Sequence, residues 1–454
     1  MSFKISRFGL LVALTAGFAE VRAESPVQST NANTQTTRDE LPPPTRKSVG
    51  FVEPLPTPSE WTSPPKALTL AELEAMAQSR NPTLTQAYAR VEAARGRWVQ
   101  AGLYPNPKLG YEGNELGNNK TAGFQGGFVS QEVVTSHKLQ LGRATVSQEV
   151  MQAEREFEAQ RLRLLNDVRT EYYNALVAQR ATELTQEVVR IDQQSFATTE
   201  SLLKAKEIGR ADLLQSRVEL NTAKLALEET RNRFVGTWRR MAAVVGSPDM
   251  TPTPLDGDPM ANIPECSWDD SLRRLLTCSP ELAAARAGVE RARWNVRREE
   301  ANKCPNVELR AGVQHDNSSG FNVANLEVGI PLPLFNRNQG NIRQAEAELT
   351  AAQANVERLE LELHRRLAIA FERYANAHNQ VNKYSKDILP DAKGSLDLVT
   401  AGYRSGDFGF LPLLTAQRTY YQSNLAQLTA LRELWESSIF IESLLLNDSL
   451  QNPR

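Results

Sequence analysis

The residue types that most often bind metals or catalyse reactions are few in this chain and widely separated. Its four histidines are His137, His315, His364 and His378. The last two lie 14 residues apart on one predicted helix, a distance of about 21 Å at 1.5 Å per residue. Zinc ligands lie about 2 Å from the ion, so these side chains cannot share one. The spacing therefore predicts no metal site.

The three cysteines are too few for a disulfide framework. Cys278 and Cys304 lie at the two ends of a predicted helix over 280–302, about 35 Å apart, whereas the Cα atoms of a disulfide lie within about 7 Å. A bond between Cys266 and Cys278 remains open. We expect packing residues here rather than a reactive thiol.

Other enzyme signatures are also missing. The chain has no glycine-rich phosphate loop, no nucleophile elbow and no CxxC pair. Carboxylate pairs such as Glu299 with Glu300, or Glu346 with Glu348, are typical of solvated helix faces. A formal net charge of −2 over 454 residues provides no basic field for nucleic acid. We predict a non-enzymatic protein with no catalytic, cofactor-binding or metal-binding residue and no nucleic-acid partner.

The elements that would position functional residues are instead a duplicated set of helices and strands. A helical run begins at Asn81-Pro82 and another at Ser279-Pro280, with proline at the first helical position in both. Later landmarks repeat at an offset of about 200 residues. Helices of coiled-coil type interleaved with membrane-sized strands indicate a conduit rather than a catalyst.

The repeat divides the chain into segments. Lys4 and Arg7 precede an apolar run over 8–19, a pattern typical of a secretory signal peptide. Nine prolines over 24–66 predict an extended tether. We expect a signal peptide over 1–23, the tether over 24–66, a first repeat over 67–246, a linker over 247–266, a second repeat over 267–448 and a tail over 449–454.

Both repeats are expected to contain one helix of exceptional length, over 136–205 and over 336–402. Each has nearly 70 residues, or about 100 Å if continuous. From Ile342 to Val356, apolar residues recur in alternating steps of three and four, as a coiled-coil seam requires. Such rods do not occur inside a compact domain.

Helix-start signals recur as well. Thr69 is expected to cap the first helix with Glu72 three residues later, and Ser267 with Asp270 opens the second repeat in the same way.

Two predicted strand pairs precede the long helices. Apolar residues from Val307 to Val313 alternate with polar residues from Glu308 to Gln314, as in a barrel strand. A soluble hairpin packed on a helix would show a similar pattern. Four strands cannot close a barrel, whereas three copies give twelve, so we predict a trimer. The strands are expected at about 108–116, 123–133, 307–316 and 321–331.

The sequence resembles the TolC-like outer-membrane efflux channels, and in particular their heavy-metal (CzcC and CusC) branch. The likeness extends from about Leu68 to Asp448, and the motifs that carry it are Asn81-Pro82-Thr83-Leu84, Tyr104-Pro105-Asn106-Pro107, Ile330-Pro331-Leu332-Pro333-Leu334-Phe335-Asn336-Arg337 and Ala401-Gly402-Tyr403-Arg404-Ser405-Gly406. The resemblance implies a mainly α fold with a small β part. Four strands per protomer would contribute to a trimeric transmembrane β-barrel, continued by a long periplasmic α-helical barrel.

The resemblance also implies a docking site for a periplasmic adaptor at the helix turns farthest from the strands. Gly209 and Gly406 can adopt the positive φ that ends a helix, which explains them without a partner. Three apolar residues at these polar turns favour docking. The expected adaptor-docking residues are Ile208, Gly209, Arg210, Asp212, Tyr403, Arg404, Gly406, Asp407, Phe408, Gly409 and Phe410.

One departure from the family pattern concerns the entrance. Relatives often carry acidic residues just after the second turn, whereas Pro412 and Thr415 occupy those positions here. An acidic gate there is in doubt, although Asp407 could substitute. Tyr403 and Arg404 could instead belong to a closed-state network.

We therefore predict a passive exit duct in the outer membrane of a Gram-negative-type bacterium. Its partners would be two further copies of itself, a periplasmic adaptor, an inner-membrane pump of the RND type and outer-membrane lipid. The suggestion of heavy-metal cargo follows from the branch resemblance alone. The alternatives are a secreted soluble coiled-coil scaffold or adaptor, and a channel for polypeptides.

Overall fold

The computed structural model describes residues 67–117 and 122–451. These residues belong to one structural unit, Ser63–Arg454. The predicted signal peptide, the whole of the predicted tether and the last three residues of the tail lie outside the described residues.

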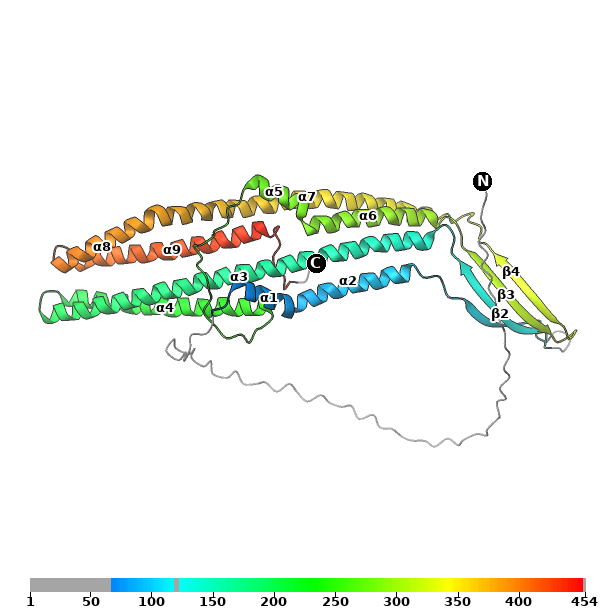
Figure 1. Cartoon of the computed structure of the whole chain (residues 1–454), viewed down its shortest axis with the longest axis horizontal. Helices are drawn as coiled ribbons and strands as arrows, with labels where there is room; N and C mark the ends of the chain where they lie inside the picture. The colour runs from blue at the N-terminus through cyan, green and yellow to red at the C-terminus, as the bar shows by residue number, and fades with distance from the viewer. Residues whose placement is uncertain (1–66, 118–121, 452–454) are drawn as a thin grey trace, which may run out of the picture. The chain divides into compact units, whose positions relative to one another are not determined.

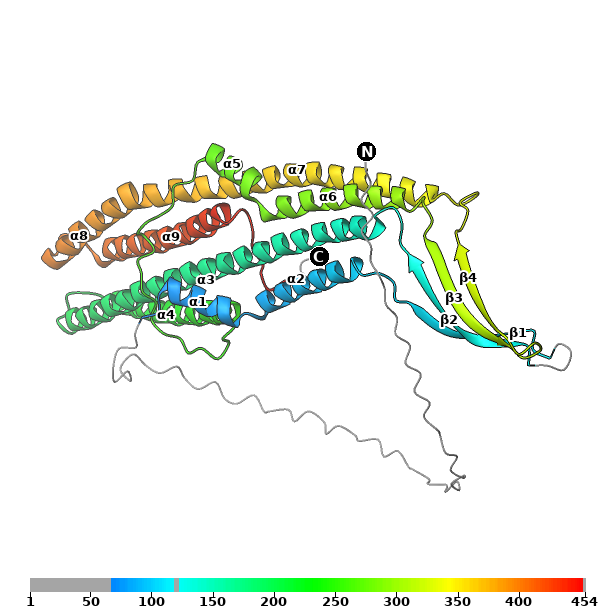
Figure 2. The ribbon, with the colours of Figure 1, turned by 45° about the vertical axis from the view of Figure 1, so that its right-hand side comes forward.

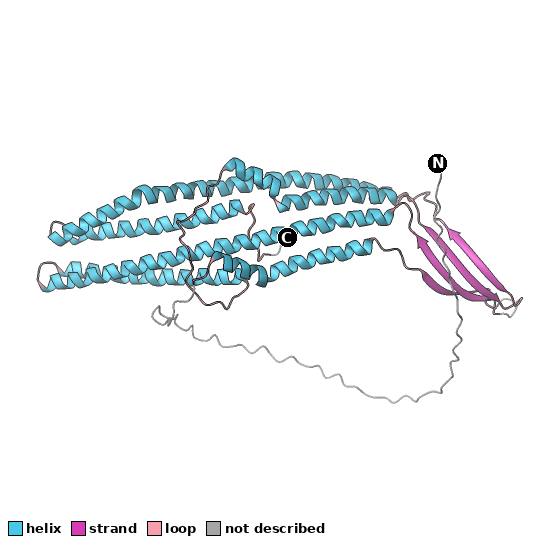
Figure 3. Cartoon of the chain, viewed as in Figure 1, coloured by secondary structure: helices cyan, strands magenta, loops and turns pink. Residues whose placement is uncertain are grey.

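Helices dominate this unit (Figure 1; Figure 3). Those of the first repeat are α1 (Leu70–Arg80), α2 (Pro82–Ala101), α3 (Lys138–Lys204) and α4 (Arg210–Val245). Those of the second are α5 (Trp268–Cys278), α6 (Pro280–Ala301), α7 (Gln339–Lys383), the π-helix η3 (Tyr384–Ile388), α8 (Leu389–Ser405) and α9 (Phe410–Glu442). No helix in the described ranges combines the length and hydrophobicity needed to cross a membrane.

The helix-start predictions are confirmed in the first repeat and only partly in the second. The Thr69 hydroxyl accepts the Glu72 N–H at 3.3 Å, and the Glu72 carboxylate accepts the Thr69 N–H at 3.1 Å. Ser267 occupies the expected position before α5, but its side chain makes no capping hydrogen bond. The prediction that Ser267 caps this helix as Thr69 does is therefore wrong.

The second long rod is interrupted, which the coiled-coil pattern did not predict. At η3 the Leu389 N–H donates to Tyr384 O, five residues back instead of four. Pro390 follows directly and has no N–H to donate, and its ring would clash with the carbonyl four residues earlier in a regular α-helix. The wider turn accommodates the proline within the rod.

The helices form a layer with α3 near its middle. α3 contacts α2 and α4 on one side and α6 and α9 on the other, and α7 and α8 follow beyond α6 and α9. Figure 2 shows the same neighbours from a second direction. Aromatic stacking joins the repeats, because the rings of Tyr173 on α3 and Trp435 on α9 lie 3.6 Å apart. Two large apolar clusters surround this junction.

The strands form one antiparallel sheet in the order β1-β2-β3-β4. Their bounds are Lys108–Asn114, Phe124–Val133, Val307–Asp316 and Asn322–Gly329. The middle pair joins the repeats, since Ser130 of β2 faces Arg310 of β3. Both long rods begin just after a strand pair, so the sheet lies at their N-terminal ends (Figure 2).

The register separates the side chains of the sheet into two distinct faces. Residues that face each other in an antiparallel pair have their side chains on the same side of the sheet. Followed across the three strand pairs, the register places every charged residue of the described strands on one face. The other face carries no charged residue, and its apolar side chains are open to solvent in a single copy. Its most exposed members are Leu109, Tyr111, Val313 and Leu326, whose exposed fractions are 84%, 70%, 60% and 79%.

The cysteines are all free, so the bond left open between Cys266 and Cys278 does not form. Burial raises the pKa of the half-buried Cys266 thiol to about 11, which disfavours the reactive thiolate.

Candidate functional site

The predicted site residues lie at the two helix turns farthest from the sheet (Figure 1). In the turn between α3 and α4, Lys206 has the left-handed conformation with φ of +62°, while Gly209 has φ of −82°. The expectation that Gly209 ends the helix with a positive φ is therefore wrong. Gly209 instead precedes α4, and its N–H donates to the Asp212 carboxylate at 3.2 Å.

The turn between α8 and α9 does use a left-handed glycine, with φ of +85° at Gly406. The N–H groups of Asp407 and Phe408 both donate to Gly402 O, at 2.8 and 3.2 Å. A Cβ atom at Gly402 would collide with the Phe408 ring. The glycine thus lets this ring fold against the end of α8 while 46% of the residue stays exposed.

Tyr403 brings several predicted site residues together. Its ring centroid lies 6.2 Å from that of Phe410. The buried Tyr403 hydroxyl lies beside Thr199 of α3. Burial is the main reason that the pKa of Tyr403 is raised, and the negative charge of the nearby Asp212 carboxylate raises it further. Tyr403 therefore connects the second turn to the hairpin of the first.

The remaining predicted residues do not converge on one point. Ile208 is half-buried and Arg210 is exposed at the start of α4. The Asp407 carboxylate accepts a hydrogen bond from the Ser405 hydroxyl at 2.7 Å. Gly409 precedes α9 in an extended conformation. The side chain of Arg404 lies outside the described part of the chain.

Sequence reasoning missed an apolar groove beside the second turn. Its volume is about 430 Å³ and it lies between α8 and α9, where Val399, Leu411, Pro412 and Thr415 line it. Leu411 is 71% exposed. In the sequence, Pro412 and Thr415 stand out only because they replace acidic residues. In the structure, the proline ring and the threonine methyl group make the α9 wall of the groove less polar.

Charges cluster where the two helical hairpins meet, some distance along the helices from the turns. Arg418 of α9 forms an ion pair with Glu219 of α4. Burial and the neighbouring Glu219 raise the pKa of Asp192 on α3 to about 6. Because Asp192 and Glu219 repel each other when both are charged, Arg418 offsets a local excess of negative charge.

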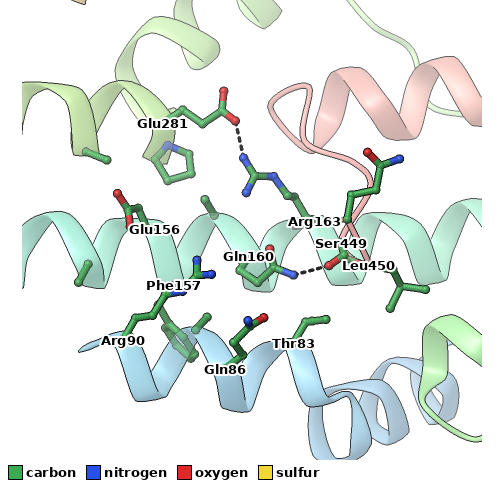
Figure 4. A pocket seen from close by; sticks show the side chains of 16 residues that line it. Thr83, Gln86, Arg90, Glu156, Phe157, Gln160, Arg163, Glu281, Ser449 and Leu450 are labelled. Carbon is green, nitrogen blue, oxygen red and sulfur yellow. Dashed lines mark hydrogen bonds and ion pairs between the residues drawn. The ribbon is translucent and has the colours of Figure 1, made fainter. Parts of the chain in front are cut away.

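A cavity of about 230 Å³ lies between α2, α3, α6 and the C-terminal segment (Figure 4). Within it, the Arg163 guanidinium donates to the Glu281 carboxylate at 2.5 Å, and Gln160 donates to Ser449 O at 2.7 Å. Arg366 also donates to Glu281, at 3.3 Å. These polar groups form hydrogen bonds with one another, and the bonds connect the two repeats.

Across residues 67–117 and 122–451, no three His, Cys, Asp or Glu side chains gather closely enough to hold a metal ion. The features that remain are a two-faced sheet, long helices and two partly apolar turns.

The sequence pattern of the outer membrane efflux protein family matches residues 73–247 and, a second time, residues 272–445. The chain belongs to this family. One relative is the cobalt-zinc-cadmium resistance protein CzcC of Cupriavidus metallidurans, 26% identical over 378 residues that cover 83% of this chain and 90% of CzcC. Another is the cation efflux system protein CusC of Escherichia coli K12, 23% identical over 299 residues that cover 62% and 64% of the two chains.

Solved structures show the same fold. The outer membrane protein VceC of Vibrio cholerae superimposes with a TM-score of 0.69 at 19% identity, covering 83% of this efflux protein and 96% of VceC. The predicted TolC-like architecture, mainly helical with a four-stranded antiparallel sheet, is confirmed.

Membership of the family establishes the general role. This efflux protein is a non-enzymatic outer-membrane channel of tripartite systems, with a periplasmic helical part. TolC-like channels form trimers and work with an adaptor and an inner-membrane pump. The alternative of a soluble scaffold is thereby set aside.

Proposed function

We propose that this protein is the exit duct for metal cations in a tripartite system of the heavy-metal branch. The pump would be of the RND type, and a periplasmic adaptor would join it to the duct. The likeness to CzcC supports the cargo, since it covers most of both chains and that protein's name records resistance to cobalt, zinc and cadmium.

The observation that carries the duct is the separation of side chains on the sheet. A face with exposed Leu109 and Leu326 suits lipid, while the charged face suits water. Three copies would supply twelve strands, enough to close a barrel around a lumen.

The adaptor would bind at the two turns. Phe408 is the best candidate for a contact residue because its ring is partly exposed at an otherwise polar turn. Gly402 leaves the space that this ring occupies, because a Cβ atom there would collide with it. The docking surface would also include Ile208, Gly209, Arg210, Asp212, Tyr403, Arg404, Gly406, Asp407, Gly409 and Phe410.

The docking surface can be tested with Phe408→Asp. The charge should oppose burial against a partner, so efflux should be lost while the amount of trimer in the membrane stays unchanged. Phe408→Tyr keeps the ring against Gly402 and should retain efflux. Gly406→Pro is a poorer test because proline cannot adopt the φ of +85° found there. Equal loss of trimer and efflux in Phe408→Asp would show that the residue is structural.

The cargo can be tested in a host lacking its own duct but retaining the partner pump and adaptor. We expect the chain to restore growth in zinc, cobalt or cadmium salts. Restored tolerance of organic drugs alone, or restored secretion of a polypeptide alone, would reject the proposed cargo and leave the family role intact.

A further inference from the structure

Arg310 occupies a central position on the charged face of the sheet. It lies on β3 and forms an ion pair with Glu112 of β1. Its other terminal nitrogen lies 3.9 Å from Glu327 of β4. One guanidinium therefore spans all four strands, passing over β2 on the way to Glu112.

A single aromatic ring on β2 makes this reach possible. Phe128 faces Gly110 of β1 and Gly312 of β3 in the register. A Cβ atom at Gly110 would collide with the Phe128 ring, so the glycine allows the ring to lie flat against the sheet. The Arg310 guanidinium carbon lies 3.8 Å above the ring centroid, where a cation is attracted to the π face.

The charges around Arg310 are mostly negative. The charged face of the described strands carries two basic side chains, Lys108 and Arg310, and five carboxylates. Each copy thus has three excess negative charges on this face. The carboxylates are Glu112, Glu132, Glu308, Asp316 and Glu327.

We propose that the charged face of the sheet gives the duct a preference for cations, and that Arg310 is the residue that sets the strength of this preference. The inference rests on the proposed duct and deepens it, since it names the property of the barrel that favours cationic cargo. Rings of carboxylates favour cations in channels generally. Arg310 lies between two of these carboxylates and offsets one unit of their negative charge.

The effect should be strong enough to measure. In a trimer the excess is nine negative charges on one lumen wall, from three in each copy. At 0.1 M salt the screening length is about 10 Å, comparable with the radius of a small barrel. Lower salt should therefore increase the cation preference.

The test uses the full-length trimer in planar lipid bilayers separating two KCl concentrations. The reversal potential gives the ratio of potassium to chloride permeability, which should exceed one for the unmodified protein. Arg310→Gln should raise this ratio, because it removes the central positive charge. Arg310→Lys keeps the charge and should leave the ratio nearly unchanged.

A second variant tests the carboxylates directly. Combining Glu112→Gln, Glu308→Gln and Glu327→Gln removes the three excess charges per copy, so the ratio should fall close to one. Phe128→Leu removes the ring beneath Arg310 and leaves the net charge the same. The ratio of potassium to chloride permeability should nevertheless differ from that of the unmodified protein. Pores whose permeability ratio is the same in Arg310→Gln and in the triple variant would overturn the inference. Failure of the unmodified protein to form any pore would overturn the proposed duct itself.

Discussion

At the scale of single residues, Glu281 connects the two repeats. Its carboxylate accepts hydrogen bonds from Arg163 of α3 and from Arg366 of α7, so it contacts both halves of the chain. The side chains of Arg163 and Glu281 are each only 20% exposed. Removing one partner of a partly buried ion pair lowers the free energy of unfolding, because the remaining charges are left without a partner.

Glu281→Gln should therefore destabilise the protein by about 2 kcal/mol, since it leaves two arginines facing a neutral amide. Thermal unfolding of the detergent-solubilised protein, followed by circular dichroism, measures the effect. Glu290→Gln on the same helix is the matched control. Glu290 pairs with Arg293 only three residues away, and both side chains are about half exposed, so its loss should cost less than about 0.5 kcal/mol. Equal effects in the two variants would show that Glu281 does not join the repeats.

At the scale of elements, the sequence predicted what depends on local periodicity. The alternation from Val307 to Val313 assigned those side chains to the correct faces, and the register of β3 with β4 places Leu326 and Val328 beside them. Asn81 and Pro82 begin α2 as expected. These outcomes follow from neighbours within a few positions of the chain.

Features that depend on distant partners could not be predicted in this way. The contact of Arg310 with Glu112, which lie 198 positions apart in sequence, requires the pairing of β2 with β3. Nothing local indicated that Lys206 rather than Gly209 would take the positive φ. Pro390 is a local signal for the interruption at η3, but a pattern of apolar spacing does not detect it.

Pro390→Ala should stabilise the second rod. Alanine restores an N–H group and removes the clash that the wider turn at η3 accommodates, so we expect a gain of about 1 to 2 kcal/mol. Hydrogen exchange should slow for the amides around Tyr384–Ile388. Pro412→Ala is the control, since Pro412 lies in the first turn of α9, where an N–H has no partner within the helix. No slowing of exchange in Pro390→Ala would show that the π-helix is held by packing instead.

At the scale of the whole molecule, the helical layer has two free edges in a single copy. One edge is formed by α2 and α4, and the other by α7 and α8. Val218 of α4 is 55% exposed and lies two residues from buried Ser216, hence about 200° around the helix from it. Leu398 of α8 is 73% exposed. Both side chains point away from the core of their own copy.

The two residues also lie at the same height. Val218 is about 14 Å from the turn at Gly209, and Leu398 about 12 Å from the turn at Gly406, at 1.5 Å per residue. A ring of three copies would bring the α4 edge of one against the α8 edge of the next, because a cyclic interface joins two different surfaces. We expect Val218 and Leu398 to be neighbours across that interface.

Cysteines introduced at both positions should therefore join three copies covalently. In a background where Cys266, Cys278 and Cys304 are replaced by serine, Val218→Cys with Leu398→Cys should give a trimer on denaturing gels after mild oxidation. Either single variant should stay monomeric there, since a ring does not bring two copies of one residue together. A dimer formed by Leu398→Cys alone would instead indicate a two-fold interface, in which the same surface meets itself. Such a pair would bring only eight strands together, a number that closes into a barrel filled with side chains and not into a duct.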